Sequence, residues 1–270
     1  MNRKASFISA AAVIFGIAGY LLRAWELQTG FNTDAGLAVS GASAHTAIII
    51  FSAVAVAAAV LAASLLSRRN GFGAASEETF SCRGSFLPLL GAAGGLAILA
   101  GAVLYGFRYG GSGIFMEPLP LIFAVAAAVS GIVETALFLC CASGRKAGGL
   151  GNFSVILPLF FCFWLLLLYK DNSTDPTILD YCFTALALAA ISLSLYYAAG
   201  FFFGRGRPGA FLFTHLTALY FGILSLADMA FDGTFLMMLG VLAAILCELI
   251  LFLRNLSPRE NDRTNKAQSE

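Results

Sequence analysis

Two glutamates interrupt long apolar runs of this chain, and each begins the same short pattern, Glu-x-x-Leu-Phe-Leu, at Glu134 and at Glu248. An unpaired carboxylate is costly in the hydrocarbon of a bilayer, so a glutamate at such a position turns toward the interior of a helix bundle. There it can stay neutral and hydrogen-bonded, or it can exchange a proton with a neighbouring base. The two positions therefore point to buried proton or cation chemistry.

His215 is the base that matches these glutamates in depth. With a helical rise of about 1.5 Å per residue, Glu134 and Glu248 lie about 9–12 Å from the ends of their apolar runs on the same side. His215 lies at a similar depth in the run before Glu248. We predict that Glu134, Glu248 and His215 form one buried polar site. It is either a proton- or cation-responsive site, or a set of interhelical hydrogen bonds that fix packing at about 0.6–2 kcal/mol each.

A second group of ionisable residues lies where the apolar runs end on the opposite side. His45 and Asp180 could contact Arg23 or Lys170 and form an outer gate, or they could be interface residues wetted by headgroup water. Glu26 belongs to the same group of outer-face candidates. The acidity of these segments indicates either ordinary solvated charge or a vestibule that attracts cations. Their acidic residues are Glu26, Asp34, Glu117, Asp171, Asp175, Asp180, Asp228 and Asp232.

The elements that must position these residues are membrane-spanning helices. The chain is 59% hydrophobic and only 11% charged, against roughly 25% charged residues in a soluble domain. Its apolar runs are long enough to cross a bilayer as helices. We predict an all-α polytopic integral membrane protein, with one membrane domain over 1–254 and a disordered cytoplasmic tail over 255–270. The eight spans are expected at about 5–22, 44–66, 85–107, 118–142, 152–169, 177–203, 209–227 and 234–253.

The basic residues predict which side faces the cytoplasm. Arg23, Arg108 and Lys170 lie on one side, which leaves 13 of the 16 lysine and arginine residues (16 − 3 = 13) on the other. Loops rich in lysine and arginine stay in the cytoplasm. We therefore expect a multi-pass protein of the cytoplasmic membrane with both termini in the cytoplasm, and the Arg23 side facing outward.

The span order is also compatible with a parallel 4+4 repeat. The two Glu-x-x-Leu-Phe-Leu matches fall in the last span of each half, and a Thr-Asp pair follows the first span of each half, at 33–34 and 174–175. Such a repeat would relate the two halves by a pseudo-two-fold axis along the membrane normal, as in some transporters.

Several kinds of chemistry lack their motifs in this sequence. It contains no P-loop, no His-Glu-x-x-His, no Gly-x-Ser-x-Gly and no Cys-x-x-Cys pattern, and it has only two histidines. We expect no cofactor, no metal site, no catalytic residue and no nucleic-acid partner. The expected partners are the lipid bilayer and a small solute or cation; the sequence does not indicate an oligomeric state.

The first loop carries a family resemblance. The segment LRAWELQTGF at 22–31, followed by TDAGL at 33–37 and Gly41-Ala42, resembles a first-loop pattern of uncharacterised multipass membrane proteins of Gram-positive anaerobes. The likeness covers residues 22–42. It implies an eight-span membrane protein without a known activity. It also suggests that Arg23, Trp25 and Glu26 form a structured cap.

These features leave three functions open. The leading hypothesis is a small-solute or ion transporter-like protein with a buried Glu/Glu/His site. The alternative is a non-transporting accessory or sensory membrane protein, and the third is a membrane-embedded enzyme acting on lipid. A water-filled cavity at Glu134 and Glu248 would favour transport. Dry, paired carboxylates would favour the accessory role, and a cleft open to lipid would favour the enzyme.

Overall fold

The regular elements of the chain are helices, as the apolar runs predict. A computed structural model describes residues 3–31, 39, 41–69, 77–80, 86–109, 118–144, 147–173 and 178–255. Within these residues, eight helices are long and apolar enough to cross a membrane, which confirms the predicted eight-span all-α architecture. The α-helices are α1 (Arg3–Thr29), α2 (Ser43–Arg69), α3 (Leu87–Tyr109), α4 (Pro118–Ser143), α5 (Ile156–Asp171), α6 (Ile178–Phe202), α7 (Pro208–Ser225) and α8 (Gly233–Arg254). The fifth span consists of α5 together with the 3-10 segment before it, over Gly148–Asp171.

Two short 3-10 helices complete these elements. One is η1 (Glu77–Phe80), between α2 and α3, and the other is η2 (Gly148–Val155), which leads directly into α5. The predicted tail at 255–270 lies outside the described residues except for Asn255, whose side-chain amide donates to the carbonyl oxygen of Thr79 at 2.7 Å. Both Thr-Asp pairs of the predicted repeat also lie outside them.

The first helix is longer than the sequence predicts. The expected span ended at residue 22, yet α1 continues to Thr29 and includes Arg23 and Glu26. Two contacts stabilise its last turn: the Thr29 hydroxyl donates to the carbonyl of Trp25 at 2.9 Å, and the Gly30 amide donates to that of Glu26 at 2.7 Å. Charged residues were expected to end the span, but here they have buried partners and the helix continues.

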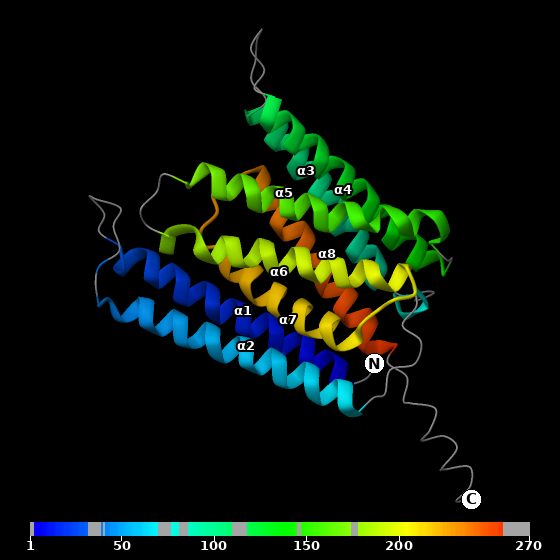
Figure 1. The fold of residues 1–270 in the computed structure, drawn as a ribbon, viewed down its shortest axis with the longest axis horizontal. Coiled ribbons are helices and arrows are strands. Elements are labelled where there is room, and N and C mark those ends of the chain that lie inside the picture. Colours follow the sequence, from blue (N-terminus) through cyan, green and yellow to red (C-terminus); the bar gives the residue numbers. More distant parts are fainter. Residues whose placement is uncertain are drawn as a thin grey trace, which may run out of the picture.

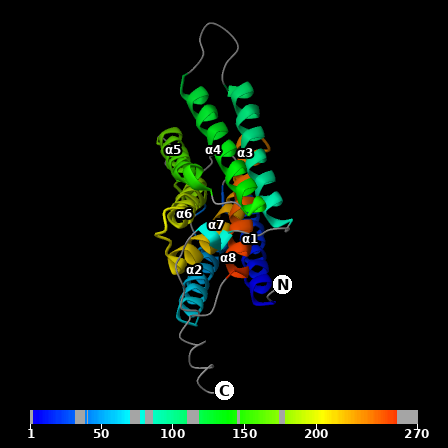
Figure 2. The ribbon, with the colours of Figure 1, turned by 90° about the vertical axis from the view of Figure 1, so that its right-hand side faces the viewer.

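The centre of the bundle is formed by α7 and α8. Burial reaches 67% in the α7 span and 72% in the α8 span, against 28% and 22% in α1 and α2. Figure 1 shows α1 and α2 side by side along one edge, with α7 packed between them and α6. The α3–α4 hairpin crosses the other helices obliquely and leans away from them (Figures 1 and 2). It is attached mainly through α3, which packs along α8.

Glycines allow α3 to approach its two neighbours closely. A Cβ atom added at Gly94 would lie 2.5 Å from the carbonyl oxygen of Gly240 on α8. A Cβ atom at Gly95 would lie 2.6 Å from the main-chain nitrogen of Thr135 on α4. Small residues let helix backbones pack in contact where no hydrophobic force between helices is available in lipid.

Both halves of the predicted repeat end at the same side, but their helices have different neighbours. The helix α3 packs mainly along α4 and α8, whereas α7, its counterpart in a 4+4 repeat, packs mainly along α6, α1 and α2 and less along α8. The repeat therefore stays a prediction from short sequence matches. Helix α1 begins and α8 ends at one end of the bundle (Figure 1), which we call the Glu134 end. The Arg23 end is the opposite one, where α1 ends and α2 begins.

Candidate functional site

His215 and Glu248 form a buried hydrogen-bonded pair between α7 and α8. The His215 Nε2 atom lies 2.9 Å from Oε2 of Glu248, and its Nδ1 lies 2.9 Å from the hydroxyl oxygen of Ser194 on α6. The same Nδ1 lies 3.0 Å from the carbonyl oxygen of Phe211, one turn earlier in α7. The Phe211 ring also covers the imidazole, with ring centroids 3.6 Å apart. The pair is thus held by three helices and shielded by an aromatic ring.

The contacts of His215 allow two proton arrangements of the pair. When the Ser194 hydroxyl donates to Nδ1, the hydrogen of the neutral imidazole is on Nε2 and is donated to an ionised Glu248. When Nδ1 donates to the Phe211 carbonyl, which can only accept, Nε2 meets Glu248 as the N–H of an imidazolium or as the acceptor of a protonated carboxyl group. The second arrangement holds one proton more than the first, so the same contacts accommodate the gain or loss of a proton.

Glu134, from α4, faces the same space. Its side chain is buried, and its Oε1 atom has no hydrogen-bond partner among the described residues. Glu134 and Glu248 line one cavity of about 10 Å³, which is close to the room that a single water molecule needs. The rest of its lining is apolar and consists of Phe80, Leu137, Phe138, Cys141 and Phe202. The structure therefore brings Glu134 and Glu248 together around a space for one water, and His215 joins them through its contact with Glu248.

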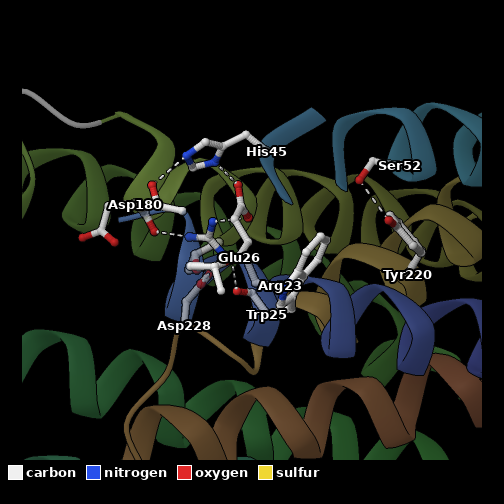
Figure 3. Close-up of polar contacts among 11 residues, drawn as sticks. Arg23, Trp25, Glu26, His45, Ser52, Asp180, Tyr220 and Asp228 are labelled. Carbon is white, nitrogen blue, oxygen red and sulfur yellow. Dashed lines mark hydrogen bonds and ion pairs between the residues drawn. The ribbon is translucent and has the colours of Figure 1, made fainter. Parts of the chain in front are cut away.

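A second cluster of polar residues surrounds Arg23 at the other end of the bundle. The Arg23 side chain is fully buried. The guanidinium donates from Nε to Oδ1 of Asp228 and from Nη1 to Oε2 of Glu26, each at 2.6 Å (Figure 3). Its Nη2 donates to the main-chain oxygen of Asp180 at 2.9 Å. The Phe183 ring covers the guanidinium, with the ring centroid 5.0 Å from its Cζ.

Each carboxylate of this cluster is also held by a second element. Glu26 Oε1 is hydrogen-bonded to Nδ1 of His45 on α2, and the other ring nitrogen of His45 lies 2.9 Å from the carbonyl oxygen of Gly30 (Figure 3). Asp228 Oδ2 accepts from the Thr184 hydroxyl on α6 at 3.2 Å. One cation and two carboxylates thus tie α1, α2, α6 and the α7–α8 connection together.

The structure changes the roles of the predicted outer-face residues. Asp180 binds Arg23 through its main-chain carbonyl, not through its carboxylate, and His45 reaches the cluster through Glu26. No sequence pattern distinguishes Asp228 from the other acidic residues of this side as the partner of Arg23. Asp228 lies outside the membrane-spanning helices, and burial raises its pKa to about 6, although the Arg23 charge acts in the opposite direction.

Eight apolar helices that bury charged residues define a multi-pass helical membrane protein. No family model, curated protein or solved structure matches this chain. The resemblance of the first loop therefore stays an expectation.

Proposed function

We propose that the protein is a transporter-like integral membrane protein for a small solute or ion, in which Glu134, Glu248 and His215 bind and release a proton. The observation that carries this proposal is the buried Glu134 oxygen without a partner, in a cavity shared with Glu248. An unsatisfied buried polar atom costs about 1–3 kcal/mol. A water molecule or a proton in this cavity is the group that would satisfy it.

The proton has a short route within the site. A water in the cavity accepts the proton of the His215–Glu248 pair and gives one of its own to the Glu134 carboxylate. An O–H or N–H bond of the pair breaks as the new O–H bond on Glu134 forms. The net charge of the site is unchanged by this step.

Loss of the proton from the site changes the forces between the helices. Two ionised carboxylates would then share one small cavity in a low-dielectric interior, where like charges repel strongly. Glu134 is on α4 and Glu248 on α8, so the repulsion acts between the α3–α4 hairpin and the centre of the bundle. Release of the proton would therefore favour a different packing of these two parts, which is how a transporter couples a proton to movement.

A non-transporting sensory or accessory role is the second candidate. It is favoured by the size of the cavity, which holds about one water molecule and is no aqueous channel. In that role the same proton would shift the helix packing without a solute crossing the membrane.

Infrared spectroscopy of the protein in lipid nanodiscs tests the proton site directly. A protonated carboxyl group absorbs separately from a carboxylate, so difference spectra between acid and alkaline pH report the titrating glutamates. We expect a buried carboxyl band that is lost in both the Glu134→Gln and the Glu248→Gln variants. Gln keeps the size and polarity of each side chain and removes its titration. The exposed Asp171→Asn variant is the control and should leave this band unchanged.

Proton uptake into proteoliposomes then separates the two functions. Under an imposed membrane potential, a transporter should move protons at a rate that falls in Glu134→Gln, whereas a sensor should titrate without net flux. A pH-dependent infrared band that persists unchanged in both Gln variants would refute the proposed proton site.

A further inference from the structure

A large pocket at the Arg23 end is separate from the Glu134 cavity. Its volume is about 590 Å³, which is within the range of small-molecule sites. It lies where α3, α5 and α6 meet the α7–α8 connection, and Leu27 of α1, Phe123 of α4 and Thr234 of α8 complete its wall. A pocket formed by so many elements is positioned by the packing of the whole bundle.

The charge of this pocket is negative. Four aspartates line it, and no lysine, arginine or histidine is among its described lining residues. Asp228 faces Arg23, but that single cation is shared with Glu26. The carboxylates of Asp171 and Asp180 are exposed and form no ion pair with a described residue; Figure 3 shows that of Asp180 directed away from the guanidinium.

Asp232 keeps its negative charge in this pocket. Burial acts to raise its pKa, but hydrogen bonds from the hydroxyl of Thr234, the amides of Phe235 and Thr234, and the hydroxyl of Tyr109 outweigh it and lower the pKa. The pocket therefore presents fixed negative charge at neutral pH.

Aromatic rings form the other part of the wall. Trp164 of α5 lines the pocket with only 7% of its surface exposed, and its indole N–H has no acceptor among the described residues. Phe123 packs against Trp164 and Tyr105, with ring centroids 5.5 Å and 4.8 Å away. Tyr181 also lines the pocket. The contacts of Phe123 pack the Trp164 and Tyr105 rings together in one part of the wall.

We propose that this pocket binds a small organic cation, either a protonated amine or a quaternary ammonium compound. Aromatic faces together with carboxylates recognise a cation that is too diffuse to be solvated strongly by water. The pocket is far larger than a bare metal ion, and no three His, Cys, Asp or Glu side chains among the described residues are placed to hold one. Anions would be repelled by the aspartates. This site does not depend on the proposed proton site of Glu134, Glu248 and His215.

Equilibrium binding to the purified full-length protein in nanodiscs tests the proposal, without any gradient or transport. Choline is the probe, and 3,3-dimethylbutan-1-ol, its neutral carbon isostere, is the matched comparison. We expect titration calorimetry to detect choline binding and no binding of the alcohol. The double variant Asp171→Asn with Asp180→Asn should weaken choline binding about tenfold or more, because it removes two charges and leaves the rings in place.

Further variants distinguish charge and ring from a general loss of structure. Asp171→Glu keeps the charge and should retain most of the affinity. Tyr181→Ala should weaken binding, whereas Tyr181→Phe, which keeps the ring, should not. Equal binding of choline and the alcohol would overturn the proposal, as would wild-type affinity in the double Asn variant. Competition by sodium or potassium at concentrations similar to that of choline would also overturn it, because it would indicate a non-selective vestibule. The infrared test concerns Glu134 and Glu248 only, so its failure would leave the result of the choline-binding experiment unaffected.

Discussion

Arg23 shows how a single residue connects distant parts of the chain. Its partners Glu26, Asp180 and Asp228 come from α1, α6 and the α7–α8 connection, and its side chain is completely buried. A buried charge of this kind is tolerated only when its hydrogen-bonding groups are satisfied. Removal of the cation would leave two carboxylates facing each other inside the protein.

We predict that Arg23→Met destabilises the protein by about 3–5 kcal/mol at pH 8, because Glu26 and Asp228 lose their cation. The loss should be smaller at pH 5. The pKa of Asp228 is already raised to about 6, so the carboxyl group is protonated at pH 5 and leaves no second unpaired charge. Thermal unfolding in detergent at the two pH values measures this. The double variant Arg23→Met with Asp228→Asn should recover part of the loss at pH 8, and an equal loss at both pH values would contradict the argument.

Contacts between individual side chains are the feature that the sequence predicted least. It identified Glu134, Glu248 and His215 because glutamate and histidine are conspicuous in apolar runs and their depths can be counted. It did not identify Ser194, since a serine in a helix usually bonds to its own preceding turn. The contact of Ser194 with His215 depends on how α6 and α7 are rotated against each other.

At the scale of the elements, the α3–α4 hairpin depends on glycine for its attachment. Gly94 and Gly240 pack backbone against backbone, and the Cβ atom of any other residue at either position would meet a carbonyl oxygen. Gly91 and Gly95 are four residues apart in the third span, and small residues at that spacing are typical of helices that pack closely. Only the structure shows which glycine faces which helix: Gly94 faces α8 and Gly95 faces α4.

We predict that Gly94→Ala or Gly240→Ala destabilises the protein by about 1–3 kcal/mol, because the added methyl group forces α3 away from α8. Thermal unfolding of the purified variants measures the effect. Gly149→Ala is the matched control, since a Cβ atom at Gly149 meets nothing within 4 Å, and it should be nearly neutral. Equal stabilities for the three variants would show that this close approach is not needed for folding.

At the scale of the whole molecule, the two polar clusters lie at opposite ends of an apolar bundle. The cluster of Glu134, Glu248 and His215 is formed between α4, α7 and α8, and the Arg23 cluster joins α1, α2, α6 and the α7–α8 connection. The two clusters therefore lie toward opposite ends of the membrane-spanning helices. The distribution of basic residues predicts which side each one faces.

We predict that the Arg23 end faces outward, and cysteine labelling tests this. Ser173→Cys, in the exposed turn after α5, should react with a membrane-impermeant maleimide on intact cells. Ser143→Cys, at the exposed end of α4, should react only after permeabilisation. Wild-type protein gives the background from the native cysteines. The reverse pattern would invert the orientation, and equal labelling of both variants in intact cells would contradict a membrane-crossing α5.

The sequence by itself determined the class, the number of spans and the depth of the ionisable residues, because these depend on local composition and on the regular rise of a helix. Tertiary structure alone decided which groups meet. The continuation of α1 through Arg23, the choice of Asp228 as its partner and the cavity between Glu134 and Glu248 all depend on how the helices are rotated and inclined. In an apolar medium, packing between helices sets those angles, and hydropathy does not encode them.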